Sequence, residues 1–436
     1  METTEPRPGL RTEFVAGVTT FFTMAYIVVV NPSILANDGT GMSFNGVLTA
    51  TVLVCFMLTL LMGVYARLPF AVAPGMGLNA FFAYTIIINQ HVPWPVALGI
   101  IFWAGVLFLL VSLTPLRVMI ARAIPASLRI ATAAGIGIFL SFIGLKNAGL
   151  ITSDAVTFVK LGTLDHKALL TVLGVLIAVW LYVRRSPFAF LASIFVVTLI
   201  ALKVDPSVKV PAQFFSRPDF QSTFLKLDIR GALKLALLPA IISILFTDLF
   251  DSISTFIGVS HAAGLVDEKG EPRRLREGLI VDAWATLGAG LAGSSSGTAY
   301  IESIAGIESG GRTGLTSVFT ALCFLPCFFL APLAAMVPSY ATAAVLLLVG
   351  AAMFRSVATL DFKRIEGALP AFLTIILIPL TFSITQGILW GFIAHTGLYL
   401  LVGRRREIHP VMYALAALSI LLLALEHGRL LELFRR

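Results

Sequence analysis

The chain has 436 residues, of which 58% are hydrophobic and only 12% are charged. Soluble domains carry about 25% charged residues, so this composition excludes an ordinary soluble domain and predicts an integral membrane protein. The net charge is +8, but the basic residues are spread over many short loops instead of forming one patch, and we therefore expect no nucleic-acid partner.

Apolar segments recur from one end of the chain to the other, and each is long enough, at about 17 to 25 residues, to cross a hydrocarbon core as a helix. We expect an all-α polytopic fold with about fourteen crossings. A further apolar segment, Val411 to Leu425, is expected to be an interfacial or peripheral C-terminal helix. The crossings centre near Ile27, Leu53, Ala80, Ala104, Phe139, Val175, Val196, Leu245, Ala285, Ile301, Leu322, Leu347, Ile376 and Ile393.

Lys and Arg are concentrated in alternate short loops, whereas the loops around Asn37, Asn89, Pro338 and Thr385 hold none. The basic bias of short loops sets the orientation of a membrane protein. We therefore expect a cell (plasma or inner) membrane protein with its N-terminus and the cluster Arg404 to Arg406 in the cytoplasm. The other basic loops contain Arg7 and Arg11; Arg67; Arg117, Arg122 and Arg129; Arg184 and Arg185; Arg273, Arg274 and Arg276; Arg312; and Arg355, Lys363 and Arg364.

The first chemically unusual stretch is "PFAVAPGMGLNAFFAY", residues 69–84, with two prolines, two glycines and Asn79 inside an otherwise apolar crossing. Asn79 offers an amide, and Phe81, Phe82 and Tyr84 offer flat apolar faces. Such groups suit a planar heterocycle with N–H donors at its edge. The chain contains 33 phenylalanines, however, so a core or lipid-facing role is the alternative for each of them.

Asp248 and Asp251 lie in the middle of a later apolar crossing, "LPAIISILFTDLFDSISTFIGV". A carboxylate at the bilayer centre costs at least about 2.5 kcal/mol, so intramembrane acids usually mark substrate, ion or proton pathways. Three residues apart, the two share a helix face, and close carboxylates disfavour double ionisation. One of them is a candidate proton carrier, and the spacing does not say which. A structural carboxylate capped by hydroxyl groups is the alternative. Asp282 lies nearer the start of its span and is ranked below them.

The second unusual stretch is "GSSSGTAYIESIAG", residues 293–306, which places Glu302 at membrane depth. Ser296, Gly297 and Thr298 lie in a run of low helix propensity. Extended backbone here would expose polar groups that can bind a ligand, and it is tolerated only where it is buried in protein or lines a cavity. A half-helix starting near Thr298 would add N–H donors beside Glu302. Close helix packing through small residues is the alternative.

The order of these features repeats in the second half of the chain. An odd number of crossings in each half inverts the second half, which is the inverted-repeat plan of secondary transporters.

The motifs resemble those of the adenine/guanine/hypoxanthine permease branch of the nucleobase transporter superfamily, which is related to the xanthine/uracil permeases. The similar stretches are "EFVAGVTTFFTMAYIVVVNPSIL", "APGMGLNAFFAY", "TDLFDSISTFIGV", "SSGTAYIESIAGIESGGRTGLTSV" and "VPSYATAAVLLLVG", within residues 13–350.

The resemblance implies fourteen segments in two seven-segment inverted repeats, with broken third and tenth segments. It further implies a core domain of residues 1–115 and 231–337, a gate domain of 116–230 and 338–403, and a cytoplasmic or interfacial helix in 404–436. It also implies proton-coupled import of purine bases by an elevator-like motion.

The same resemblance assigns the base-holding acids to Glu302 and to Asp248, with Asp251 as the second choice. Backbone groups near Asn79, Ala80 and Phe81 and near Ser296, Gly297 and Thr298 would complete the site. The glutamine–histidine pair of the xanthine/uracil branch is absent from the first segment, where Thr23 and Tyr26 stand as substitutes. The coupling proton is assigned to Asp248, Asp251 or Glu302.

The expected partners are a purine base, a coupling proton and the lipid bilayer, with a homodimer left open, and no cofactor or metal is expected. An anion transporter or channel of the sulfate-transporter type is the alternative within transport, although its site should offer positive charge. A membrane-embedded enzyme is the alternative outside transport, and no nucleophile–base pair or metal cluster favours it.

Overall fold

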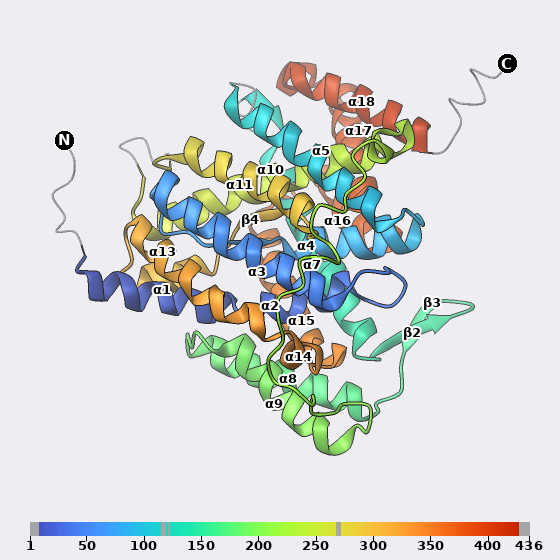
Figure 1. Cartoon of the computed structure of the whole chain (residues 1–436). Helices are drawn as coiled ribbons and strands as arrows, with labels where there is room; N and C mark the ends of the chain where they lie inside the picture. Colours follow the sequence, from blue (N-terminus) through green and yellow to red (C-terminus); the bar gives the residue numbers. More distant parts are fainter. Residues whose placement is uncertain (1–7, 115–118, 121–122, 267–271, 427–436) are drawn as a thin grey trace.

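Helices make up most of the chain, and short strands lie among them near the centre of the molecule and in a hairpin at its edge (Figure 1). The computed structural model describes residues 8–114, 119–120, 123–266 and 272–426. Arg7, Arg117, Arg122 and the expected domain boundary at residue 115 lie outside the described residues, as does the last part of the 404–436 segment.

In chain order the longer helices are α1 (Leu10–Met24), α2 (Ile27–Leu35), α3 (Phe44–Leu61), α5 (Trp94–Leu113), α7 (Ala126–Asn147), α8 (His166–Val183), α9 (Ala189–Val204), α10 (Leu238–Ala263), α11 (Leu275–Ala292), α13 (Gly314–Phe324), α15 (Ser339–Phe354), α16 (Ile365–Thr381), α17 (Ile384–Leu401) and α18 (Pro410–Glu426). The short helices are α4 (Met76–Ala80), α12 (Ser303–Glu308) and α14 (Ala331–Ala335). Tight or wide helical turns are η1 (Met62–Ala66), η2 (Phe81–Asn89), η3 (Gly231–Leu233), η4 (Leu235–Leu237), η5 (Leu325–Phe329), η6 (Arg355–Thr359) and η7 (Arg405–Glu407). The strands are β1 (Val72–Pro74), β2 (Ile151–Asp154), β3 (Phe158–Leu161) and β4 (Gly297–Ala299).

Eight helical stretches of the described residues are long and apolar enough to cross a membrane, and five more are apolar but shorter. The expectation of a mostly helical, multi-pass membrane protein is confirmed in this form, while the count of fourteen crossings stays a prediction. The eight are Leu10–Leu35, Phe44–Ala66, Trp94–Leu113, Ala126–Asn147, His166–Val183, Leu235–His261, Ser339–Thr359 and Ile384–Leu401.

Polar residues begin several of these helices. Ser43 accepts a hydrogen bond from the Gly46 amide at the start of α3, and Asp165 accepts from the amides of Lys167 and Ala168 at the start of α8. These side chains satisfy amides that have no partner within the helix. The capping residues Ser43 and Asp165 therefore set where these two helices begin.

Small residues allow two close helix crossings. A Cβ atom on Gly350 of α15 would lie 2.4 Å from the carbonyl oxygen of Gly137 on α7, and one on Gly306 of α12 would lie 2.6 Å from that of Ala16 on α1. Association through small residues is common where lipid replaces water. The helices α7, α15, α16 and α17 pack mainly on one another. In a second group, α13 packs on both α1 and α3, and α11 packs on both α3 and α5.

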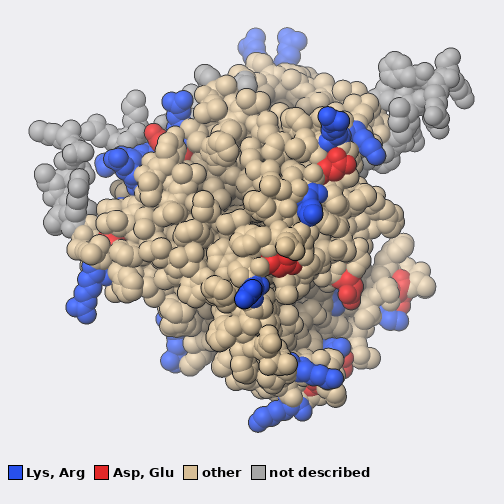
Figure 2. All heavy atoms as spheres, in the orientation of Figure 1, with Lys and Arg blue, Asp and Glu red and all other residues tan. Residues whose placement is uncertain are grey.

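The visible face of the molecule is largely uncharged, with Lys and Arg side chains scattered mainly near its periphery (Figure 2). Many large apolar side chains are exposed, among them Leu176, Phe195, Leu380 and Ile420. Large exposed apolar surfaces mark contact sites for membranes or for other proteins. The surface therefore agrees with a multi-pass membrane protein.

Candidate functional site

The centre of the candidate site is a pair of short antiparallel strands from opposite halves of the chain. Val72 pairs with Ala299, Ala73 with Thr298 and Pro74 with Gly297, which joins β1 to β4. Figure 1 shows β4 and α4 among the surrounding helices. The expectation of extended backbone in residues 293–306 is confirmed at β4.

Neighbouring side chains and backbone groups form hydrogen bonds with the amides and carbonyls in and beside the strands. Thr59 of α3 accepts from the Val72 amide at 2.9 Å and donates to the Val72 carbonyl at 3.0 Å. The Gly75 amide donates to the Ser296 carbonyl at 2.8 Å, and the Tyr300 hydroxyl donates to the Pro74 carbonyl. Unpaired backbone groups are costly in lipid, so these bonds allow irregular backbone at this depth.

Helix α12 begins at Ser303, so the expectation of a half-helix starting near Thr298 is wrong. Thr298 and Ala299 belong to β4, and the Tyr300 amide extends this pairing by donating to the Ala71 carbonyl at 2.9 Å. Because β4 pairs with β1, the helix begins only after the strand, and Glu302 is the residue immediately before it.

Glu302 is partly exposed, and its Oε1 atom accepts the Tyr26 hydroxyl at 2.7 Å. Tyr26 lies in the break between α1 and α2. Thr23 donates to the Thr20 carbonyl at 2.8 Å, with only a 3.5 Å contact to the Glu302 carbonyl. The structure thus brings Thr23 and Tyr26 to Glu302, and it is Tyr26 that orients the carboxylate.

Asp248 and Asp251 lie one turn apart on α10 in different environments. Asp248 is fully buried, and its Oδ2 atom accepts the Thr286 hydroxyl from α11. Asp251 is partly exposed and accepts no hydrogen bond from any residue that the structure describes. Helix α10, which carries Asp251, packs on α12, which begins directly after Glu302.

The sequence ranked Asp282 below the other acids because it lies nearer the start of its span, and its depth in the membrane stays a prediction. Asp282 is fully buried on α11. Its Oδ2 atom accepts the Ala299 amide at 3.1 Å and the Thr298 hydroxyl at 3.4 Å. Asp282 therefore supports β4 directly.

Asn79 lies in a buried network of polar side chains. Its amide donates to Asn31 Oδ1 at 3.1 Å, and Asn31 donates to Thr51 at 2.8 Å and to Ser294 at 3.0 Å. This network joins α2, α3, α4 and the loop before β4. Asn79 is fully buried, and its Oδ1 atom has no partner among the described residues.

The remaining expected site residues surround the strand pair. Ala80 and Phe81 are fully buried at the junction of α4 and η2. The Ser296 hydroxyl is buried without a partner in the described part of the chain, and the Gly297 carbonyl accepts the Thr286 hydroxyl at 3.2 Å.

Two further residues near these acids were missed from the sequence. Thr286 contacts both Asp248 and β4, and Phe190 of α9 packs its ring 4.9 Å from that of Tyr26. Phe190 is one of 33 phenylalanines, and nothing in the neighbouring sequence distinguishes it from the others. Thr286 is recognisable only as the residue one helical turn after Asp282.

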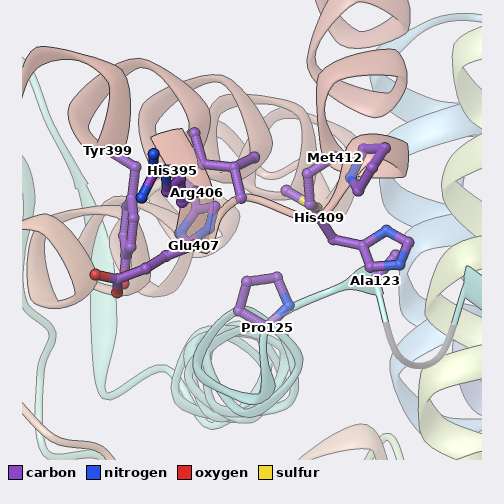
Figure 3. Close-up of a pocket in the computed structure, with 10 residues that line it drawn as sticks. Ala123, Pro125, His395, Tyr399, Arg406, Glu407, His409 and Met412 are labelled. Carbon is purple, nitrogen blue, oxygen red and sulfur yellow. The ribbon is translucent and has the colours of Figure 1, made fainter. Parts of the chain in front are cut away.

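A separate cavity of about 500 Å³ lies away from these acids (Figure 3). Its lining includes His395 and Tyr399 of α17, Arg406 and Glu407 of η7, and His409 just before α18. The cavity contains none of the residues around the strands. Among the described residues, no group of three His, Cys, Asp or Glu side chains is placed to hold a metal ion.

A multi-pass helical protein whose interrupted segments meet beside buried acids has the architecture of a membrane transporter. Residues 11–389 match the family model Xan_ur_permease, described as the Permease family, and the chain belongs to this family. The family resemblance inferred from the motifs is therefore confirmed.

Two relatives are similar over almost the whole chain. The adenine permease AdeP of Escherichia coli (strain K12) is 42% identical over 412 residues, which cover 94% of this chain and 92% of that protein. The guanine/hypoxanthine permease PbuO of Bacillus subtilis (strain 168) is 38% identical over 423 residues, which cover 95% of this chain and 97% of that protein.

The transmembrane domain of BicA, a cyanobacterium bicarbonate transporter, has a similar fold. Its solved structure matches with a TM-score of 0.65 and 18% identity, covering 88% of this chain and 97% of that one. At this identity the likeness shows a common fold only.

Proposed function

We propose that the chain is a secondary active transporter that imports purine nucleobases of the adenine, guanine and hypoxanthine class by proton symport. The relatives that share most of its length are named adenine and guanine/hypoxanthine permeases. The chemistry of the site supports the same substrates, because carboxylates accept hydrogen bonds from ring N–H groups.

The observation that carries the proposal is the position of Glu302, which is partly exposed, held by Tyr26 and next to the paired strands. Glu302 and Asp251 accept hydrogen bonds from the purine. We prefer Asp251 to Asp248 for this contact, because Asp248 is fully buried and already accepts the Thr286 hydroxyl.

The flanking segments complete the proposed substrate site. Thr23 and Tyr26 lie on one side of Glu302. Asn79 to Phe81 follow β1, and Ser296 to Thr298 lead into β4 and form its first residues. These two segments supply the polar and apolar walls of the site. Irregular backbone of this kind builds midplane sites in many transporters.

The proposed architecture has fourteen segments in two seven-segment inverted repeats, with the core and gate ranges given above. Its support is that the interrupted segments of the two halves pair with each other and that α7, α15, α16 and α17 pack mainly together. Movement of the core past the gate would then expose the site alternately on each side, in an elevator-like cycle.

Uptake of radiolabelled adenine, guanine and hypoxanthine into proteoliposomes tests this function. We expect purines to compete with one another, and we expect Glu302→Gln to abolish high-affinity uptake while the protein stays folded. Glu308→Gln is the matched control, because Glu308 is an exposed acid at the end of α12. Normal purine uptake by Glu302→Gln would refute the role of Glu302.

The similarity in fold to a bicarbonate transporter keeps anion transport as the alternative. Within the described residues, no ion pair joins Lys, Arg or His to Asp248, Asp251, Asp282 or Glu302. An anion site would need positive charge that these side chains do not provide. Uptake of bicarbonate or sulfate without purine uptake would favour this alternative.

A further inference from the structure

A compact cluster of two carboxylates and three hydroxyls joins α10, α11 and β4. Asp248 and Ser252 lie one turn apart on α10, and Asp282 and Thr286 lie one turn apart on α11. Thr286 donates to Asp248, while Thr298 lies 3.4 Å from Asp282 Oδ2 and 3.3 Å from the Ser252 hydroxyl. Each acid is thus bound by a hydroxyl from another element.

All five side chains of this cluster are closed off from solvent. Asp248, Ser252, Asp282 and Thr286 are 0% exposed, and Thr298 is 2% exposed. One oxygen of each carboxylate, Oδ1, nevertheless has no hydrogen-bond partner in the described part of the chain. Buried polar atoms are almost always hydrogen-bonded, so the two orphan oxygens require an explanation.

The cluster also lacks a compensating charge. Asp248 is repelled by Asp282 and Asp251, Asp282 is repelled by Asp251, and Asp251 is in turn affected by Glu302. All four of these groups are acids. Two ionised carboxylates sharing a buried site without a cation are strongly disfavoured. The pair therefore needs a proton or another cation.

We propose that the buried acids Asp248 and Asp282 carry the coupling proton, at a site separate from the substrate-facing acids Asp251 and Glu302. A proton removes one of the negative charges and with it the repulsion between two buried ionised carboxylates. A proton also needs no space, whereas an alkali cation needs several oxygen ligands around a void, and the fully buried side chains leave no water-sized space beside the carboxylates.

The cluster is connected to the substrate site through β4. Asp282 accepts the Ala299 amide at 3.1 Å, and Thr286 lies 3.2 Å from the Gly297 carbonyl. A change in protonation alters these bonds and so the strand next to Glu302. This inference rests on the proposed function, because it assigns the proton of purine–proton symport.

Purified full-length protein in proteoliposomes tests the inference with Asp282→Asn and radiolabelled adenine. Three quantities are measured: equilibrium adenine binding, adenine–adenine exchange, and accumulation driven by a pH gradient. We expect accumulation to fall at least about tenfold while exchange, which moves no net proton, is retained. Glu308→Gln should accumulate adenine like the wild type. Gradient-driven accumulation by Asp282→Asn at the wild-type level would overturn the inference.

Thr286→Val tests the same site with both acids in place, and covers a failure of Asp282→Asn to fold. Without the Thr286 hydroxyl, the ionised Asp248 carboxylate loses a hydrogen-bond donor. The pH of half-maximal accumulation should therefore move upward by about one unit. An unchanged pH profile would contradict the inference. Accumulation driven by a sodium gradient alone would also overturn the assignment to a proton. If the wild type neither binds nor exchanges any purine, the proposed function itself fails.

Discussion

The Tyr26 hydroxyl donates to Glu302 Oε1 across 2.7 Å, which joins the break between α1 and α2 to the residue before α12. The Tyr26 ring in turn packs 4.9 Å from Phe190 of α9. One side chain thereby orients the acid of the proposed substrate site and contacts a helix of the proposed gate domain.

Tyr26→Phe keeps the ring and removes the hydroxyl. Because hydrogen bonds to charged groups contribute about 1.5 to 3 kcal/mol, we expect purine affinity to fall about tenfold or more. Equilibrium binding of radiolabelled purine measures the change. The matched control is Tyr65→Phe, since Tyr65 is exposed on η1. Equal affinities in the two variants would show that the bond does not serve binding.

The crossing of α7 and α15 has no space for a larger residue at Gly350. An added Cβ atom would lie 2.2 Å from the Ser141 hydroxyl and 2.4 Å from the Gly137 carbonyl, so Gly350→Ala should destabilise the protein by about 1 to 3 kcal/mol. Gly397→Ala on α17 is the control, since a Cβ there meets no atom within 4 Å. Thermal unfolding in detergent should separate the two variants, and similar midpoints would contradict the close crossing.

Arg404 forms an ion pair with Glu366 at 2.7 Å, and the Glu366 side chain is only 8% exposed. Arg404→Gln would leave this acid buried without its partner, so we expect a loss of about 3 kcal/mol in unfolding free energy. Arg405 is exposed, and Arg405→Gln should change little. The double variant Arg404→Gln/Glu366→Gln should recover much of the loss. No recovery in the double variant would mean that Arg404 acts through other contacts.

Asp205 lies just beyond the end of α9, outside the membrane-spanning segments. Hydrogen bonds from the Ser207 hydroxyl and amide, and then from the Tyr340 hydroxyl, hold the pKa of Asp205 below its usual range. A lowered folded-state pKa stabilises the protein above the unfolded pKa of about 3.9, and the stabilisation is lost as the pH falls below that value.

Asp205→Asn should therefore lower the thermal midpoint at pH 7, and its difference from the wild type should shrink as the pH is lowered from about 5 towards 3. Melting curves in detergent over this range measure the effect. Asp361→Asn, an exposed acid, is the control. A difference that stays constant across the range would show that ionisation of Asp205 is not what stabilises this junction.

Much of the architecture could be predicted because its signals are local. Thirteen of the fourteen expected crossing centres fall within helices, and the remaining one, Ile301, lies between β4 and α12. Apolar length fixes the helices, and the glycines, prolines and hydroxyl residues of the interrupted segments disfavour regular helix there. Glu302 was found for the same reason, as a charged residue inside such a segment.

The sequence did not reveal contacts made between distant segments. The hydrogen bond from the Ala299 amide to the Asp282 carboxylate joins two elements that no local pattern links. The start of α12 was misplaced because pairing with β1 outcompetes the helix at Thr298, and no propensity within residues 293–306 contains that information. Both features depend on contacts between segments far apart in the sequence, which local propensities do not contain.

The pairing of β1 with β4 also has a consequence for biosynthesis. β1 leaves the ribosome long before β4, so the Ala71 carbonyl and the Gly75 amide enter the bilayer before their partners Tyr300 and Ser296 exist. The nascent first half must satisfy these groups with water or with the insertion machinery, and the central site closes only once the later half has been translated. Expressing the two halves as separate polypeptides should therefore give stable protein only when both are made together.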